Sequence, residues 1–223
     1  MQPKWVPTRL LDVGTQDSPS IRLRIMDQES PRQPYLTLSH CWGKCEFLRL
    51  LEGNFESMKA GIRIDDLPRT FQDAVTITRR LDVKYLWIDS LCIIQENEED
   101  WTKESSMMGH VYQNGLCNIA ATGAPDGTGG CFMERDPVLA RKCRVRVDKL
   151  LSKFKLKPGL YDLVPKNLWE NGLSNAPLNR RAWVAQERIL APRILHFSKN
   201  QLFWECNGLV SCVLLDIAEQ NPV

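Results

Sequence analysis

The sequence predicts an α/β fold with a parallel sheet, and two observations support this. Between residues 35 and 121, short apolar segments typical of buried strands alternate with amphipathic segments typical of helices. A strand–helix–strand–helix–strand order of this kind implies right-handed crossovers between parallel strands. The polar loops at residues 39–44 and 89–104 each follow a strand, so we expect them to emerge at one edge of the sheet, where open α/β sheets bind ligands.

Composition is ordinary for a globular protein and argues against several functions. The 223 residues are 43% hydrophobic and 25% charged, so a packed core is expected. The net charge of +2, without a long run of lysine or arginine, argues against nucleic acid as a partner. No apolar run approaches the roughly 20 residues of a membrane-spanning helix, and no apolar core of a secretion signal follows Met1. No membrane span is therefore expected.

The eight cysteines are scattered and form no C-x-x-C pair, which is typical of reduced thiols in a cytoplasmic protein. One group suggests zinc, because His40, Cys41 and Cys45 lie close together in the chain. No second ligand pair at finger-like spacing accompanies them. We therefore expect no metal and no cofactor, and interpret the two cysteines as small residues in a tight loop.

Residues 1–34 are expected to form an N-terminal extension with short strands, since residues 21–25 alternate between apolar and charged side chains. The first strand of the core is predicted at residues 35–38. A short helix is predicted over residues 54–60, with Gly61 ending it.

The next helix is expected to begin at residues 65–68, where two aspartates and a proline are typical of a helix N-terminus. Apolar side chains recur at helical spacing through residues 67–81, so one face of this helix should pack on the sheet. The strand at residues 85–88 is continuously apolar, as strands covered on both faces tend to be. A helix over 98–113 and a strand over 116–121 complete the βαβαβ core, which ends at about residue 122.

The C-terminal block, residues 140–206, is less regular, and residues 207–223 are interpreted as a tail. Within the block we expect a strand at residues 143–147, a helix at 179–190, and a β-hairpin of residues 194–197 and 201–206.

Several ordered motifs resemble those of the fungal heterokaryon incompatibility (HET) domain, and the similarity spans residues 35–206. The motifs are YLTLSHCWG at 35–43, LPRTFQDA at 67–74, YLWIDSLCIIQ at 85–95, DWTKE at 100–104, YQN at 112–114, RAWVAQER at 181–188, RILHF at 193–197 and WEC at 204–206. Three positions depart from the family pattern. His40 replaces a common tyrosine, Glu96 a common aspartate and Gly115 a usual alanine, and His40 adjoins the expected cleft.

The resemblance implies both a fold and a function. HET domains are distantly similar to Toll/interleukin-1 receptor (TIR) domains, so it implies a TIR-like, flavodoxin-like core with an added C-terminal helix and hairpin. It further implies a cytoplasmic effector of fungal non-self recognition and programmed cell death. Some TIR domains hydrolyse NAD with the glutamate of an Asp-Trp-x-x-Glu segment, which matches residues 100–104. By this analogy Glu104 is the catalytic carboxylate, and NAD is a substrate.

The residues expected to bind the substrate come from the two polar loops. They are Ser39, Trp42, Gly43, Lys44, Asp89, Asp100 and Trp101. Gly43 permits close approach of the backbone, and Lys44 suits a phosphate. Trp101 suits stacking on a base or serves as a core anchor, and Asp100 suits the cap of the helix.

Other residues have competing interpretations. Glu104 is either the catalytic group, a helix-surface residue, or a residue paired with an arginine. Glu187, with Arg181, Trp183 and Gln186, either completes the pocket or locks its helix to the sheet, and the lock is favoured. His196 is interpreted as a satisfied core histidine.

An alternative function is a non-enzymatic signalling module that works by self-association or by recruiting other cell-death proteins. Apolar side chains around Met107, Met108 and Tyr112 would then form the assembly face, although core packing explains them equally well. No further domain follows the last motif, so the chain is expected to be a stand-alone effector or a shortened product.

Overall fold

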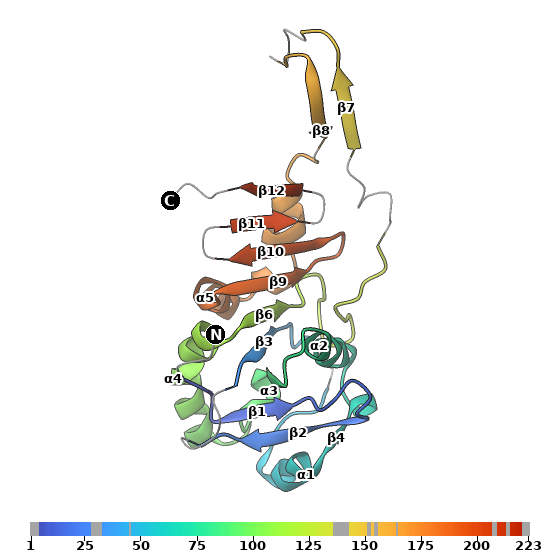
Figure 1. Cartoon of the computed structure of the whole chain (residues 1–223). Helices are drawn as coiled ribbons and strands as arrows, with labels where there is room; N and C mark the ends of the chain where they lie inside the picture. The colour runs from blue at the N-terminus through green and yellow to red at the C-terminus, as the bar shows by residue number, and fades with distance from the viewer. Residues whose placement is uncertain are drawn as a thin grey trace.

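The computed structural model in Figure 1 combines a large mixed sheet with helices and a separate hairpin. It describes residues 5–27, 33–44, 46–135, 143–150, 153, 156–163, 165–206, 209–212 and 215–219. Cys45 of the considered zinc group lies outside these residues. Among the described residues, no three metal-binding side chains cluster and no helix combines the length and apolarity needed to span a membrane.

Four parallel strands form the centre of the sheet, as the alternating pattern predicts. They are β3 (Tyr35–Ser39), β5 (Tyr85–Trp87), β6 (Cys117–Ala120) and β9 (Arg193–Phe197). Across the sheet their order is β9-β6-β3-β5, so the chain moves from β3 to one side and then crosses to the other. The register pairs Leu36 with both Leu86 and Cys117. Ligands bind beside the carboxyl ends of strands where the direction of winding reverses.

Antiparallel strands extend both edges of this parallel centre (Figure 1). Beyond β5 lie β1 (Arg9–Asp12), β2 (Ser20–Ile25) and β4 (Ile62–Arg63), and beyond β9 lie β10 (Leu202–Cys206), β11 (Leu209–Cys212) and β12 (Leu215–Glu219). The strands predicted in the N-terminal extension therefore join the main sheet. The hairpin predicted near residues 194–206 is confirmed as β9 and β10.

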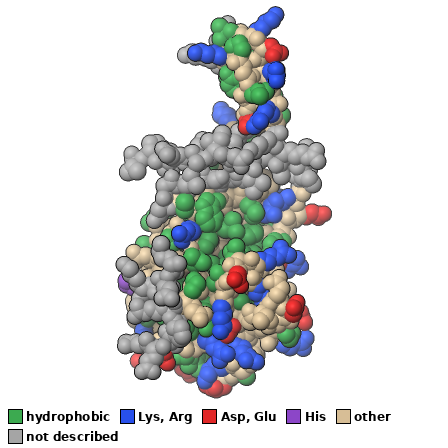
Figure 2. Space-filling model, in the orientation of Figure 1, with side chains coloured by type: hydrophobic (Ala, Val, Ile, Leu, Met, Phe, Trp, Pro, Cys, Tyr) green, Lys and Arg blue, Asp and Glu red, His purple; other side chains and the backbone are tan. Residues whose placement is uncertain are grey.

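The strand predicted at residues 143–147 is confirmed as β7 (Cys143–Val147), which pairs with β8 (Gly159–Leu163) in a separate two-stranded sheet. This hairpin projects from the rest of the molecule (Figure 1). Figure 2 shows lysine, arginine and apolar side chains together on its surface.

The helices are α1 (Phe55–Ala60), α2 (Arg69–Arg80), α3 (Asp89–Cys92), α4 (Glu98–Asn114) and α5 (Ala182–Leu190). Shorter turns are η1 (Glu52–Asn54), η2 (Ile64–Asp66), the π-helical turn η4 (Glu170–Ser174) and η5 (Leu178–Arg180). The predicted apolar face of α2 is confirmed, since Phe71, Ala74 and Val75 are buried in the core. Helices α4 and α5 lie side by side (Figure 1).

Two predicted helix starts are wrong by a few residues, for local reasons. Asp65 and Asp66 lie in η2, and α2 begins only at Arg69. Proline disfavours helical backbone in the residue before it, and Leu67, which precedes Pro68, is extended (φ −86°, ψ 148°). Similarly, α5 begins at Ala182 because Arg181 is extended (φ −89°, ψ 131°).

Helix α5 is tied to the β9–β10 hairpin by a charged cluster. Arg188 donates two hydrogen bonds to Glu205, of 2.7 and 3.1 Å, and the Nε2 atom of His196 lies 3.1 Å from the same carboxylate. Burial opposes ionisation of Glu205, but the hydrogen bonds from His196 and Arg188 prevail and lower its pKa to about 2. Burial lowers the pKa of His196. The interpretation of His196 as a core histidine with satisfied partners is thereby confirmed.

Replacing Glu205 by glutamine should therefore destabilise the fold in a pH-dependent way. Because its pKa is depressed in the folded state, the carboxylate contributes stability above the ordinary value of 4.5 and loses it as the pH falls toward 2. We expect Glu205→Gln to lower the free energy of unfolding by roughly 1–2 kcal/mol at pH 7, allowing for solvent screening. Urea unfolding between pH 7 and pH 3 measures this. A deficit that stays constant with pH, or an equal one in the exposed control Glu56→Gln, would contradict it.

Candidate functional site

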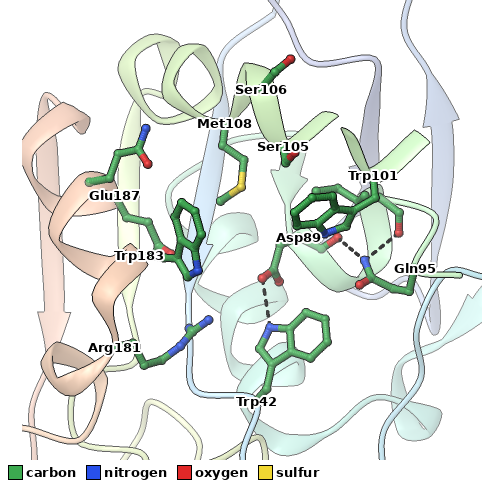
Figure 3. Close-up of a pocket in the computed structure, with 12 residues that line it drawn as sticks. Trp42, Asp89, Gln95, Trp101, Ser105, Ser106, Met108, Arg181, Trp183 and Glu187 are labelled. Atoms are coloured by element: carbon green, nitrogen blue, oxygen red, sulfur yellow. Dashed lines mark hydrogen bonds between the residues drawn. The ribbon is translucent and has the colours of Figure 1, made fainter. Parts of the chain in front are cut away.

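A pocket of about 370 Å³ lies where the loops after β3 and β5 meet helices α4 and α5, close to the predicted edge of the sheet (Figure 3). Its lining residues are Trp42, Asp89, Ile93, Gln95, Trp101, Ser105, Ser106, Met108, Arg181, Trp183, Gln186 and Glu187. The pocket is mostly apolar with a few polar groups, which is the usual character of a small-molecule site.

Three indole rings surround the pocket, each from a different segment. Trp42 follows β3, Trp101 stands near the start of α4 and Trp183 in the first turn of α5 (Figure 3). Trp101 is 51% exposed and Trp183 62% exposed. The interpretation of Trp101 as a core anchor is therefore wrong. Large aromatic rings left open to solvent beside a pocket offer flat surfaces on which a planar ligand can stack.

Asp89 places a carboxylate among these rings (Figure 3). It is the first residue of the short helix α3 and lies two residues after Trp87, where β5 ends. One carboxylate oxygen accepts a hydrogen bond of 3.0 Å from Nε1 of Trp42, and the other accepts one of 2.7 Å from the backbone N–H of Ser90. Gln95 donates 3.2 Å to the carbonyl of Asp89 and fixes the turn. The carboxylate is thus held in one orientation and still lines the pocket.

Glu187 is the second carboxylate of the pocket, and it is only 4% exposed. It accepts a short hydrogen bond from the hydroxyl of Ser39, at the carboxyl end of β3. Asn118 of β6 donates 2.9 Å to that hydroxyl and accepts 3.0 Å from Thr37. Burial raises the pKa of Glu187, partly offset by hydrogen bonds from Ser39 and Tyr112, while the charge of Asp89 raises it further.

Arg181 supplies the positive charge of the pocket. Its guanidinium donates a short hydrogen bond to the carbonyl of His40, which holds the loop after β3 against the start of α5. Burial lowers the pKa of His40. The imidazole Nδ1 lies 3.8 Å from Asp89, and Nε2 has no hydrogen-bond partner within the described part of the chain. An arginine beside two carboxylates suits a ligand with both phosphate and hydroxyl groups.

Glu104, the predicted catalytic residue, does not line this pocket. It is 4% exposed and lies 3.5 Å from Arg9 of β1. Nη2 of Arg9 also lies 2.6 Å from both carboxylate oxygens of Asp100, and its Nε donates 2.7 Å to the carbonyl of Cys92. The interpretation of Glu104 as paired with an arginine therefore matches the geometry, whereas the interpretation as a helix-surface residue is wrong because Glu104 is buried. Arg9 joins β1 to α4 and to the end of α3.

Asp100 does not cap α4, so that interpretation is wrong. The cap is Asn97, whose side chain accepts a hydrogen bond of 2.8 Å from the backbone N–H of Asp100. The Asp100 carboxylate accepts instead from the N–H of Ile94, at 2.8 Å, besides Arg9. The sequence gives no signal for this, because Arg9 lies 91 residues earlier in the chain.

The remaining predicted site residues lie around the pocket without lining it. Ser39 is buried behind Glu187, and Lys44 is exposed to solvent. Gly43 has φ +65° and packs so closely on Asp126 that a Cβ atom would collide with that side chain. Of the predicted set, the pocket brings together Trp42, Asp89 and Trp101. It adds Glu187, for which the only signal in the sequence was the RAWVAQER motif.

A family model described as "Heterokaryon incompatibility protein (HET)" matches residues 35–187, more than half of the chain. The match begins with β3 and ends at Glu187, so it includes every lining residue of the pocket. Arg9 lies outside it. No curated protein and no solved structure matches the chain.

Replacing Arg9 by methionine tests the role of Arg9 as an anchor. The change leaves Glu104 buried and Asp100 mostly buried without their cation, and breaking such a pair costs about 3–5 kcal/mol. We expect the free energy of unfolding, measured in urea, to fall by that amount. Adding Glu104→Gln should recover part of the loss, because it removes one unpaired charge. The exposed Arg24→Met is the control, and an equal loss there would contradict the anchoring role.

Proposed function

The chain belongs to the HET family, and on this premise we propose that it is an effector of fungal non-self recognition and cell death that hydrolyses NAD in the tryptophan-lined pocket. The observation that carries the proposal is the meeting of three indoles, two carboxylates and one arginine in a single pocket. Its volume of about 370 Å³ falls within the range of roughly 300–1,000 Å³ that is common for small-molecule sites. The strand order β9-β6-β3-β5 supports a flavodoxin-like, TIR-related core.

Each group of the pocket has a counterpart in a nicotinamide nucleotide. Trp101 and Trp183 offer ring faces for stacking the nicotinamide or the adenine. Arg181 suits a phosphate oxygen, as a cation with several donors. Asp89 has its two oxygens oriented by Trp42 and Ser90, and it suits the ribose hydroxyls.

The proposed reaction breaks the bond between the nicotinamide nitrogen and C1′ of the ribose. The bonding electrons leave with nicotinamide, which becomes neutral, and positive charge develops on the ribose. Water then adds at C1′ and releases a proton, giving ADP-ribose. A desolvated carboxylate beside the ribose stabilises the developing charge more strongly than one in water. Glu187 is such a group, because it is buried and lines the pocket.

In this proposal Glu187, and not Glu104, faces the substrate. The analogy with TIR domains assigns the catalytic role to Glu104, and that assignment stays a prediction. The geometry favours Glu187, because Glu104 faces Arg9 and does not line the pocket.

A second function has its own supporting observation. On helix α5, Trp183 and Ile189 are both exposed, and together they border a shallow hollow. Such a surface suits contact with another protein, as the non-enzymatic signalling alternative requires. The face considered earlier around Tyr112 suits that role less, because Tyr112 is buried against Trp87.

Nicotinamide release from NAD by the purified chain tests these proposals. We expect release by the wild type, falling by roughly 100-fold or more in Glu187→Gln, because that variant removes the charge that stabilises the transition state. Glu104→Gln is the matched control and should retain activity. Protein concentration is varied, since self-association can complete a site.

The other outcomes decide between the alternatives. Activity lost in Glu104→Gln but kept in Glu187→Gln would return the catalytic role to Glu104. An absence of release from the wild type at every concentration would remove the hydrolase and leave the signalling module.

The pH dependence of the reaction provides a further test. Only ionised Glu187 stabilises a positive charge, and burial raises its pKa. The rate should therefore increase with pH, with a midpoint above the ordinary pKa of a glutamate. Initial rates measured between pH 4 and pH 8 (about the range in which the fold is expected to persist) give the midpoint. A rate that declines as the pH rises through this range would be incompatible with the assigned role.

A further inference from the structure

We propose that the β7–β8 hairpin binds the surface of an anionic lipid membrane. Its strands, Cys143–Val147 and Gly159–Leu163, form a sheet of their own that projects from the rest of the molecule (Figure 1). Among the described helices and strands, each of the two packs extensively only on the other. A two-stranded hairpin without further support is at best marginally stable in water, so a surface that covers it would stabilise it. This inference does not depend on hydrolysis of NAD.

One face of the β7–β8 hairpin carries only uncharged residues, which are opposed pairs in the strand register. They are Cys143 with Leu163, Val145 with Tyr161 and Val147 with Gly159. Opposed residues of an antiparallel pair point to the same side of the sheet, as do alternate residues along each strand. Leu163 is 58% exposed and Val145 is 38% exposed, so this apolar face is open to solvent. Apolar side chains gathered on an exposed face indicate a surface that another surface covers.

The opposite face of the hairpin is charged. Arg144 is opposed to Asp162 and donates two hydrogen bonds to its carboxylate, of 2.7 and 3.2 Å, so these two charges neutralise each other. Arg146 is opposed to Leu160, and both side chains are exposed. The two faces of the hairpin therefore differ in character, one apolar and the other with an exposed cation.

Positive charge prevails along the described residues from β7 to β8. Five cations stand against two anions there: Arg144, Arg146, Lys149, Lys153 and Lys157 against Asp148 and Asp162. The three lysines are exposed, and Figure 2 shows lysine and arginine beside apolar side chains on this part of the surface. This local excess of three positive charges is larger than the net charge of +2 of the whole chain. The partner that complements the hairpin is therefore negatively charged.

A membrane with anionic headgroups complements both the apolar face and the positive charge. Elements that lie on a membrane bury an apolar face by about 5–10 Å at the boundary between headgroups and acyl chains, while lysine and arginine contact the headgroups. The long apolar stems of lysine side chains allow this arrangement. Such binding needs no spanning helix, and the projection of the hairpin lets it reach a membrane ahead of the rest of the molecule (Figure 1). A second copy of the chain suits the hairpin less, because two hairpins of the same charge repel each other.

Sedimentation of the full chain with lipid vesicles tests the proposal. One kind of vesicle is phosphatidylcholine alone, and the other contains equal parts of phosphatidylcholine and phosphatidylserine. We expect the chain to bind the anionic vesicles at least about tenfold more tightly, because each cation near their surface adds to the attraction. Binding should weaken as the ionic strength rises from about 0.1 M to about 1 M, since the Debye length falls from about 10 Å to about 3 Å.

Two pairs of variants locate the contact on the hairpin. Leu163→Ser should weaken binding to the anionic vesicles by roughly tenfold or more, because it removes an apolar side chain from the face that enters the membrane. Leu160→Ser is its matched control, since Leu160 is 59% exposed but lies on the opposite face, and it should bind as the wild type does. Lys149→Gln should weaken binding by about fivefold, whereas Lys199→Gln, at an exposed position of the β9–β10 turn, should leave it unchanged.

Three results would overturn the inference. One is equal binding of the wild type to both kinds of vesicle, or binding to neither. Another is an equal effect of the two leucine variants or of the two lysine variants, which would place the contact elsewhere on the molecule. The third is binding of a poly-glutamate peptide without binding of anionic vesicles, which would replace the membrane with an acidic protein. The comparison of the two vesicles needs only the wild-type chain, so it decides the matter even if a variant does not fold.

Discussion

The hydrogen bond between Ser39 and Glu187 links the central strand β3 to helix α5, and the candidate site depends on it. Ser39 ends the central strand β3, whereas Glu187 lies on α5, 148 residues later. Burying a carboxylate is costly unless it is hydrogen-bonded, and here Ser39 and Tyr112 provide that support. The same bond that attaches α5 to the sheet therefore also holds a desolvated carboxylate at the pocket wall.

A second constraint comes from Arg9, which lies outside the segment that matches the HET family. Its guanidinium satisfies Asp100 and approaches Glu104, two residues of the segment that resembles a TIR catalytic motif. In this chain that segment thus fastens α4 to β1. The exposed side of the same helix turn presents Trp101 to the pocket. One short motif therefore contributes a buried anchor and an open aromatic surface.

Both constraints concern charged groups that have been removed from water. Glu104 is buried against Arg9 and does not line the pocket, while Glu187 lines the pocket, is hydrogen-bonded by Ser39 and Tyr112, and lies within the electrostatic influence of Arg181. A carboxylate that lines the pocket can stabilise a charge on a ligand bound there, whereas one that faces a buried arginine away from the pocket cannot. This difference in environment, and not the identity of the residue, separates the anchoring glutamate from the proposed catalytic one.

The sequence by itself determined the βαβαβ core, the β9–β10 hairpin, the family and three residues of the pocket, Trp42, Asp89 and Trp101. The core and the hairpin follow from apolar periodicity, and the pocket residues follow from the rule that loops after parallel strands share an edge. The family follows from ordered motifs that resemble those of the HET domain. Only the tertiary structure showed that Glu187 lines the pocket while Glu104 faces Arg9. The partner of a buried polar group is set by packing between distant segments, as with Arg9 and Asp100 or Ser39 and Glu187. No spacing along the chain encodes such contacts.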